Sequence, residues 1–118
     1  MKASENLIVD KSFQFAIDII AFTDILEGQR KYTVAKQLTK SGTSIGANVH
    51  EAQSPESKND FVHKLKIAAK EACETKYWLL VCQKCPTLPD PGDLLTKVES
   101  IQRILSSIIA TCKNRYTK

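Results

Sequence analysis

Four stretches of the chain repeat apolar residues every three or four positions, which is the spacing of a helix with a buried face. The most regular stretch lies between residues 55 and 84, where intervals of four and three alternate strictly. This heptad repeat predicts a helix that packs along its whole length. Its repeat positions are Phe61, Leu65, Ala68, Ala72, Thr75, Leu79 and Cys82. A second heptad series predicts a last helix, with Leu94, Val98, Ile101, Leu105, Ile108 and Cys112.

The first expected helix, which Gly28 ends, carries two apolar stripes instead of one. One stripe is Ile8, Phe15, Ile19, Phe22 and Leu26, and the other is Val9, Phe13, Ala16 and Ile20 with Ile17 beside it. A helix that covers a single core needs one stripe about 100° wide. We therefore expect the other stripe to meet a second subunit.

The second expected helix contains two glycines four residues apart, Gly42 and Gly46. Each interior glycine costs a helix about 1 kcal/mol relative to alanine, so a closely packed neighbour must compensate. The thin face of the third helix, at Ala68 and Ala72, is the expected neighbour. A polar ribbon at helical spacing runs beside the glycines and predicts a half-buried polar network. It consists of Ser41, Ser44, Asn48 and Glu51.

The breaks between the helices are short. Pro55 is expected in the first turn of the third helix, where proline is tolerated. Three prolines predict one well-defined loop over residues 85–92. Thr33 is the expected cap of the second helix, and Asp90 or Asp93 that of the last.

Four helices with short connections predict an all-α fold, an antiparallel up-and-down four-helix bundle. A length of 118 residues fits a single domain over 1–118. The expected helices cover about 6–27, 33–54, 55–84 and 93–115.

The net charge of +4 is unevenly distributed. Residues 1–27 hold two lysines against five acids, whereas residues 28–84 hold ten basic residues against five acids. A basic field attracts phosphate or acidic proteins, but a solvated helix face has the same pattern. Without a recognition-helix or base-stacking motif, nucleic acid would be bound through its phosphates. The candidate contacts are Arg30, Lys31, Lys36, Lys40, Lys64, Lys66 and Lys70.

The residues that could carry chemistry do not complete a known site. Cys82 and Cys85 form a single CxxC motif, while a structural zinc needs four ligands. Asp60 and His63 form one carboxylate-histidine pair, where di-iron bundles need two pairs and further carboxylates. We predict no catalytic residue, no metal site and no cofactor. The cysteines expected to pack as small apolar side chains are Cys73, Cys82 and Cys112.

The apolar segment near the N-terminus is interrupted by Asp10, Lys11 and Asp18. Neither a signal-peptide core nor a membrane span fits there. Four cysteines without a secretory signal favour reduced thiols. We expect a cytoplasmic protein without a membrane partner.

The strings QLTKSGTSIGANVHEAQ and DFVHKLKIAAKEACETKYWL, with the opening NLIVDKSFQFA, resemble the four helix bundle protein family, also called S23 ribosomal protein or 23S rRNA intervening-sequence protein. The resemblance covers the first three helices. The family pattern falls on Ser41, Gly42, Thr43, Ser44, Ile45, Gly46, Ala47, Asn48, Glu51, Ala52, Phe61, Lys64, Leu65, Ala68, Glu71, Ala72, Glu74, Tyr77 and Trp78. His50 and Lys76 depart from it.

This resemblance implies a bacterial four-helix bundle that assembles into a ring, as a homopentamer, without established enzymatic activity. A related branch contains the accessory proteins of diversity-generating retroelements, which are basic pentamers that bind nucleic acid and a reverse transcriptase. The ribosomal name does not itself imply a ribosome component.

Two hypotheses follow. The first is a non-enzymatic oligomeric scaffold that binds structured RNA or DNA through backbone contacts of its lysines. The alternative is a protein-protein adaptor for a neighbouring gene product, in which the charge serves solubility.

Overall fold

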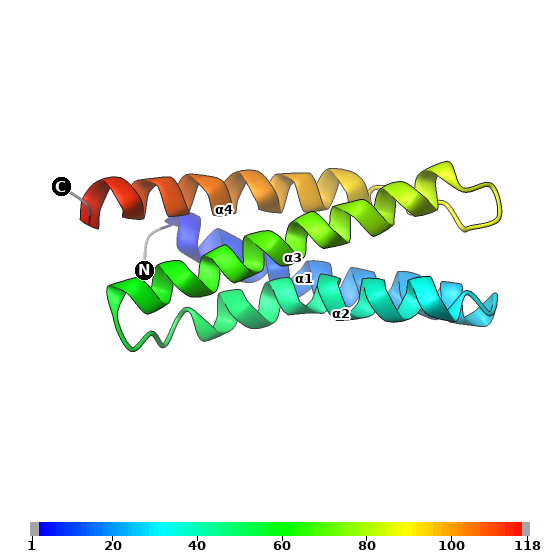
Figure 1. Ribbon diagram of the computed structural model, residues 1–118, viewed down its shortest axis with the longest axis horizontal. Coiled ribbons are helices and arrows are strands. Elements are labelled where there is room, and N and C mark those ends of the chain that lie inside the picture. The colour runs from blue at the N-terminus through cyan, green and yellow to red at the C-terminus, as the bar shows by residue number, and fades with distance from the viewer. Residues whose placement is uncertain (1–2, 117–118) are drawn as a thin grey trace.

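All four periodic stretches form α-helices in the computed structural model, which describes residues 3–116 (Figure 1). These residues contain no strand. The helices are α1 (Ala3–Gly28), α2 (Tyr32–Glu51), α3 (Lys58–Lys84) and α4 (Leu94–Tyr116). Residues 1, 2, 117 and 118 of the expected domain lie outside the described part.

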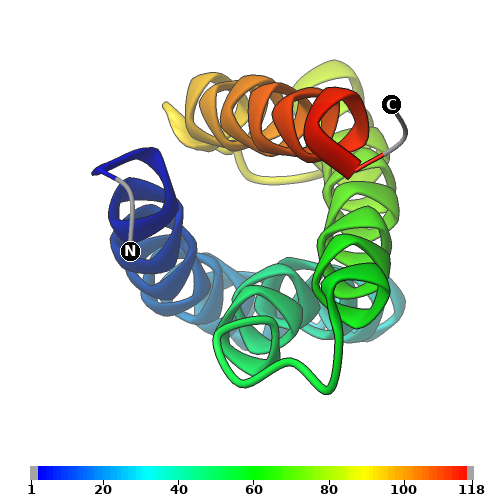
Figure 2. The same cartoon turned by 90° about the vertical axis from the view of Figure 1, so that its left-hand side faces the viewer.

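The helices run antiparallel, and each packs on the helices next to it in sequence, while α1 also contacts α4. The end view shows the four arranged around a common centre (Figure 2). The α1–α2 and α3–α4 connections lie at one end of the bundle, and the α2–α3 connection lies at the other end with both termini (Figure 1). The bundle measures 50 × 22 × 21 Å. The predicted four-helix bundle is thus confirmed.

The heptad positions of α3 and α4 form the core as expected. Leu65, Ala68, Ala72 and Leu79 on α3 are at most 1% exposed. The first apolar stripe of α1 is buried with them, from Ile8 to Leu26. The second stripe of α1 faces outward, and its exposed fractions are 67% for Phe13, 47% for Ile17 and 46% for Ile20.

The expected partner of the α2 glycines was wrong, because both glycines face α1 and not the alanines of α3. A Cβ atom added at Gly42 would lie 2.8 Å from Cγ2 of Ile19. One added at Gly46 would lie 2.9 Å from the backbone oxygen of Ser12. Successive helical residues are about 100° apart, so Ser41, next to Gly42, points instead to α3. There its hydroxyl shares a 3.0 Å hydrogen bond with that of Thr75.

The polar ribbon of α2 is not the continuous network that its spacing predicted. Ser44 donates to the backbone oxygen of Lys40 at 2.6 Å, and Asn48 donates to that of Ser44 at 2.8 Å. Both side chains therefore bond to their own helix, as serine and asparagine often do. Only the buried Ser41 and the exposed Glu51 reach α3.

The break between α2 and α3 is longer than expected, since α2 ends at Glu51 and α3 begins at Lys58. Ser57 is the N-cap, and its hydroxyl accepts a 3.0 Å hydrogen bond from the backbone N–H of Asp60. The Asp60 carboxylate in turn accepts one from the N–H of Glu56 at 3.1 Å. This reciprocal cap is close to a capping box. Because it starts the helix at residue 58, Pro55 lies in the loop and not in a first helical turn.

Of the caps expected from single residues, that of α2 is wrong, whereas that of α4 is one of the two residues predicted. Thr33 lies inside α2, whose N-cap is Lys31 without a side-chain hydrogen bond. At the start of α4, the backbone oxygen of Asp93 accepts from the N–H of Lys97, while the Asp90 carboxylate accepts from Gly92 in the preceding turn. Asp93 therefore takes the capping position.

The α1–α2 turn has the hydrogen bonds of a Schellman motif. The Lys31 N–H donates to the oxygen of Leu26 at 2.8 Å, and the Arg30 N–H donates to that of Glu27 at 2.9 Å. In this motif the residue after the C-cap takes a left-handed conformation, usually as glycine. Here it is Arg30, with φ of 61°. Gly28 was expected directly after a helix end at about Glu27, but it is the last residue of α1, and Arg30 takes the left-handed position.

None of the helices described between residues 3 and 116 combines the length and apolar character required of a transmembrane helix.

Candidate nucleic-acid interface

The lysines of α2 and α3 form two separate pairs and not one patch. Ser41 is level with Thr75, and Glu51 is level with Lys64, so the two helices are aligned antiparallel. This alignment puts Lys36 and Lys40 beside the segment 76–80 of α3, and it puts Lys66 and Lys70 beside the segment 46–50 of α2. At 1.5 Å per residue, the two pairs lie about 15 Å apart along the bundle.

Pairing with acidic residues divides the lysines into two groups. Lys64 lies 3.4 Å from Glu51, Lys76 lies 3.3 Å from Glu99, and Lys97 lies 2.9 Å from Asp18. Each of these three pairs joins two different helices. Within residues 3–116, no ion pair is formed by the exposed candidates Lys36, Lys40, Lys66 and Lys70.

Lys64 therefore differs from the other candidates. Its side chain is 30% exposed and holds α3 to α2 through Glu51. A phosphate would have to compete with this carboxylate, so Lys64 fits a structural role better than a binding role.

Arg30 and Lys31 lie in the turn at the end of the bundle, away from Lys66 and Lys70. Arg30 is exposed and Lys31 is partly buried. Lys31 is near enough to Cys85, at the end of α3, to help lower the pKa of that thiol. The exposed Lys84, the last residue of α3, lies at the same end, so this end of the bundle carries basic residues from the α1–α2 turn and from α3.

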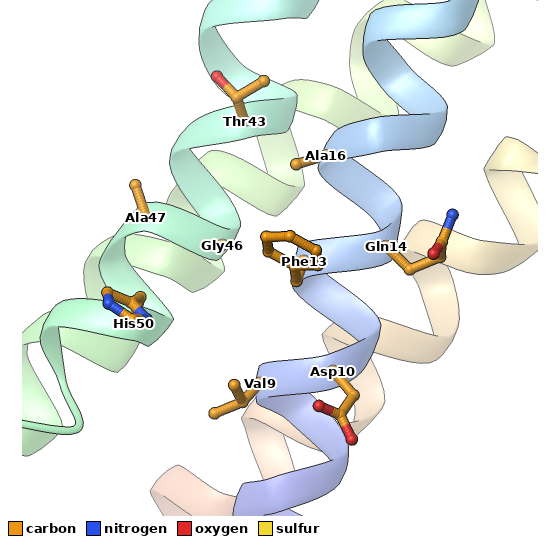
Figure 3. A pocket seen from close by; sticks show the side chains of 9 residues that line it. All are labelled: Val9, Asp10, Phe13, Gln14, Ala16, Thr43, Gly46, Ala47 and His50. Carbon is orange, nitrogen blue, oxygen red and sulfur yellow. The ribbon is translucent and has the colours of Figure 1, made fainter.

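An apolar groove runs between α1 and α2 on the outside of the bundle (Figure 3). It encloses about 580 Å³. Val9, Phe13 and Ala16 extend from α1 toward α2, and the Phe13 ring lies near Gly46 (Figure 3). The opposite wall comes from α2 and consists of Thr43, Gly46, Ala47 and His50. Three residues of the second α1 stripe, Val9, Phe13 and Ala16, line this groove, whereas the exposed Ile17 and Ile20 lie outside it.

A second, more polar hollow lies where α2 turns into α3. It encloses about 550 Å³ and is lined by His50, Glu51, Ser54, Glu56, Asp60 and Lys64. The Asp60 carboxylate accepts a hydrogen bond from the backbone N–H of Glu56, and the Glu51 carboxylate forms an ion pair with Lys64. Across residues 3–116, no three His, Cys, Asp or Glu side chains are placed so that they could hold a metal ion.

The four cysteines differ in environment. Cys82 and Cys112 are buried as predicted, but Cys73 is exposed and lies 3.7 Å from the amide nitrogen of Gln102. Burial raises the pKa of the Cys82 thiol to about 11, with a further contribution from Cys85. Hydrogen bonding to Thr87 lowers the pKa of the Cys85 thiol, and Lys31 adds to this effect. Cys85 is thus the more readily ionised thiol of the CxxC motif.

The remaining motif positions lie on the side of α3 that faces α2. The backbone oxygen of Glu71 accepts from the Thr75 hydroxyl at 2.7 Å, and Trp78 packs partly buried against the core. The ring of Trp78 meets that of Tyr77 edge-on, with centroids 5.1 Å apart. Glu71 thus bonds within α3, and Trp78 adds to the packing of the core.

Sequence reasoning did not count two exposed residues of α3, Tyr77 and Lys84, among the candidate nucleic-acid contacts, although Tyr77 belongs to the family pattern. Tyr77 is 58% exposed, and Lys84 is exposed at the end of the helix. Both continue the interval of seven that starts at Lys70, and this interval was a signal available from the sequence.

Comparison with known proteins agrees with the fold. The family described as 23S rRNA-intervening sequence protein matches residues 4–107. A similar solved structure is a crystal structure from Bacteroides thetaiotaomicron of a protein with unknown function from the S23 ribosomal protein family. It is 37% identical, with a TM-score of 0.85, and the alignment covers 91% of this chain and 98% of that chain. No curated protein matches this chain.

Proposed function

We propose that this chain, which belongs to the 23S rRNA-intervening sequence protein family, is a non-enzymatic scaffold that assembles with copies of itself and binds structured RNA or DNA through the phosphate backbone. One observation carries the nucleic-acid part of the proposal. Three lysines that face neighbouring helices are paired with acids, whereas the exposed Lys36, Lys40, Lys66 and Lys70 form no ion pair in the described structure. Their charge is available to an external anion.

The helical geometry supports an extended anion as the ligand. Each pair places two ammonium groups one helical turn apart, about 6 Å along the axis. The like charges at this spacing slightly destabilise the helix, and a bound phosphate would remove that cost. Because the two pairs lie about 15 Å apart, a polymer could contact both, whereas a single phosphate group could contact only one.

A salt titration tests this function. Binding of a structured RNA of mixed sequence should weaken steeply between about 50 and 200 mM salt, because the lysines release counterions from the phosphates. Absence of binding at the lowest salt, or binding that ignores salt, would contradict the proposal. Replacing Lys36, Lys40, Lys66 and Lys70 with glutamine should reduce the log-log salt slope by up to about 3–4, since each phosphate contact contributes about 0.7–0.9.

The matched control replaces two paired lysines, Lys64 and Lys76, with glutamine. Both variants should keep their helix content by circular dichroism. If each replaced lysine of the control reduced the RNA affinity as much as each replaced lysine of the Lys36, Lys40, Lys66 and Lys70 variant, the division between paired and unpaired lysines would be wrong.

A protein-protein adaptor is the second candidate, and the exposed groove around Phe13 favours it. Affinity capture from the native host, with and without nuclease, separates the two functions. Recovery of one protein partner that resists nuclease would favour the adaptor. Recovery that nuclease abolishes would favour nucleic-acid binding.

Self-assembly is supported by the second apolar stripe of α1. Monomeric soluble proteins seldom leave a row of large apolar side chains exposed on one helix. Phe13, Ile17 and Ile20 form such a row, and the groove beside them gives the row a concave border. The ring-shaped homopentamer implied by the family resemblance is the arrangement that we propose for this surface.

A further inference from the structure

The outer face of α3 carries an aromatic side chain between lysines. Lys70, Tyr77 and Lys84 follow one another at intervals of seven, and Lys66 lies one turn before Lys70. All four side chains are exposed, Tyr77 by 58%. Residues at intervals of seven lie on the same side of a helix, so these residues form one row, which we call the α3 row.

Contacts on both flanks show which way this row faces. Thr75 bonds to Ser41 on α2. Cys73 and Lys76 contact Gln102 and Glu99 on α4. The α3 row lies between these flanks and opposite the buried heptad face, so it points away from the bundle.

The row is basic as well as aromatic. Lys66, Lys70 and Lys84 have no ion pair within residues 3–116. Glu74 is exposed beside the row, and it forms no ion pair with Lys70 although the two are four residues apart. Three lysines thus face one carboxylate, which leaves an attractive surface for an anionic polymer.

The ring of Tyr77 packs against the ring of Trp78, and this contact holds Tyr77 in place for a ligand. Its ring meets the partly buried Trp78 at an interplanar angle of 78° and a centroid distance of 5.1 Å. This edge-on contact restricts the Tyr77 ring, so less conformational freedom is lost when a ligand stacks on it.

We propose that the α3 row binds single-stranded nucleic acid, with a base stacked on Tyr77 and the flanking phosphates bound by Lys70 and Lys84. This inference rests on the proposed nucleic-acid binding and names the form of nucleic acid and the stacking residue. Lys70 and Lys84 each lie about 10 Å from Tyr77 along the helix axis. A base can reach the ring only when it is unstacked from its neighbours, and this condition favours a single strand over a duplex.

The test compares Tyr77→Ala with Tyr77→Phe in binding a fluorescent single-stranded oligonucleotide of mixed sequence. Loss of one base-stacking contact should weaken binding by about 5- to 150-fold in Tyr77→Ala. Tyr77→Phe should bind like the wild type, because the aromatic face remains. The salt slope should be the same in all three proteins, because the lysines are intact.

An equally exposed tyrosine provides the matched control, since Tyr32 is 61% exposed on α2. Tyr32→Ala should bind like the wild type. Equal losses in Tyr32→Ala and Tyr77→Ala, or no loss in Tyr77→Ala while the wild type binds the oligonucleotide, would overturn the inference but not the proposed function. A wild type that binds no RNA or DNA at all would overturn both. A wild type that binds duplex but no single strand would overturn the stacking proposal. So would a protein partner that binds the α3 row and is not displaced by the oligonucleotide.

Discussion

The backbone oxygen of Ser12 on α1 lies 2.9 Å from the place where a side chain at Gly46 on α2 would begin. Contacts this close to a Cβ atom are essentially never seen, and a backbone oxygen inside a helix cannot move aside as a flexible side chain can. Glycine at position 46 therefore sets the distance between α1 and α2. It also shapes the apolar groove, since Gly46 lies in the groove wall (Figure 3).

Gly46→Ala should consequently destabilise the protein by up to about 2 kcal/mol, because an overpacking cost of about 1–3 kcal/mol is offset in part by a gain of about 1 kcal/mol in helix propensity. Gly46→Leu should disrupt folding or assembly. Urea denaturation followed by circular dichroism measures the first effect, and light scattering measures the second.

The same substitution at Gly28 is the control, because no atom lies within 4 Å of the place where its Cβ would be. Gly28→Ala should be neutral or stabilising by up to about 1 kcal/mol. Similar stabilities of Gly46→Ala and Gly28→Ala would show that the contact with Ser12 does not limit the helix spacing.

Periodicity predicted the buried faces of these helices well, and the reason is physical. A residue such as Leu79 or Leu105 must leave water wherever the neighbouring helix lies, so its spacing alone identifies its face. The flank of a helix carries less information. Gly42 and Ser41 differ by one position, yet one packs on α1 and the other on α3. The spacing of residues along α2 does not indicate which of its two flanks faces α1 and which faces α3. For this reason Gly42 and Gly46 were predicted to pack on α3, although they pack on α1.

The candidate interface shows the same limit. The exposed positions of Lys36, Lys40, Lys66 and Lys70 followed from their helical spacing. Their division into two pairs depended on the alignment of α2 with α3, which is fixed by contacts such as Ser41–Thr75. Ion pairs between helices depend on this alignment too, so Lys64 was grouped with lysines that form no ion pair in the described part of the chain. Cys73 was expected inside because cysteines often are, but its position on the α4 flank leaves it exposed.

Arg30 provides a second prediction, because an arginine occupies the left-handed position of the α1–α2 turn. This conformation costs a residue with a Cβ about 1–2 kcal/mol relative to glycine. Arg30→Gly should therefore stabilise the protein by about 1 kcal/mol, less the entropy that glycine adds to the unfolded chain. Thermal unfolding should show a melting temperature about 3–6 °C higher.

The same variant also tests Arg30 as a phosphate contact. Arg30→Asn is the control, since asparagine tolerates the left-handed conformation without the charge. Both variants should lower the RNA affinity equally if Arg30 contributes charge. A melting temperature of Arg30→Gly below that of the wild type would contradict the proposed strain.

Asp18 gives a prediction about pH. Burial raises the pKa of its carboxyl group, but hydrogen bonds from Lys97 and Gln14 and the charge of Lys97 outweigh burial and hold the pKa below its usual value of 3.8. A carboxyl group with a lowered pKa stabilises the folded state above its unfolded pKa, and this contribution disappears as the pH falls through the folded pKa. Asp18→Asn should cost up to about 1 kcal/mol near neutral pH.

Urea titrations of the wild type and of Asp18→Asn over a range of pH measure this effect. The difference in free energy of unfolding should shrink as the pH falls below 3.8. A difference that stays constant with pH would mean that Asp18 contributes through packing and not through its charge.

The CxxC motif predicts unequal thiol reactivity. Cys85 has a lowered pKa and is partly exposed, while burial raises the pKa of Cys82 to about 11. Because the thiolate is the reactive form, iodoacetamide should modify Cys85 well before Cys82 at mildly alkaline pH. Peptide mass mapping over time measures both rates, and the buried Cys112 is an internal control for inaccessibility.

Thr87→Val should slow the reaction of Cys85, because the hydrogen bond to Thr87 favours the thiolate. Equal rates of alkylation at Cys82 and Cys85 would contradict the burial of Cys82 and the lowered pKa of Cys85.

The outward stripe of α1 predicts how the protein assembles. Phe13 is the most exposed large apolar residue described and also lines the groove between α1 and α2. If copies of the chain pack through this stripe, Phe13→Asp should lower the molar mass in light scattering at micromolar concentration to that of a monomer. The monomer should stay folded, because Phe13 contributes nothing to the core of its own bundle.

Leu80→Asp is the control, since Leu80 is 37% exposed on α3, away from the groove, and should leave the assembled mass unchanged. A wild-type protein that is already monomeric would refute self-assembly, whereas an assembled Phe13→Asp variant would move the interface to another face.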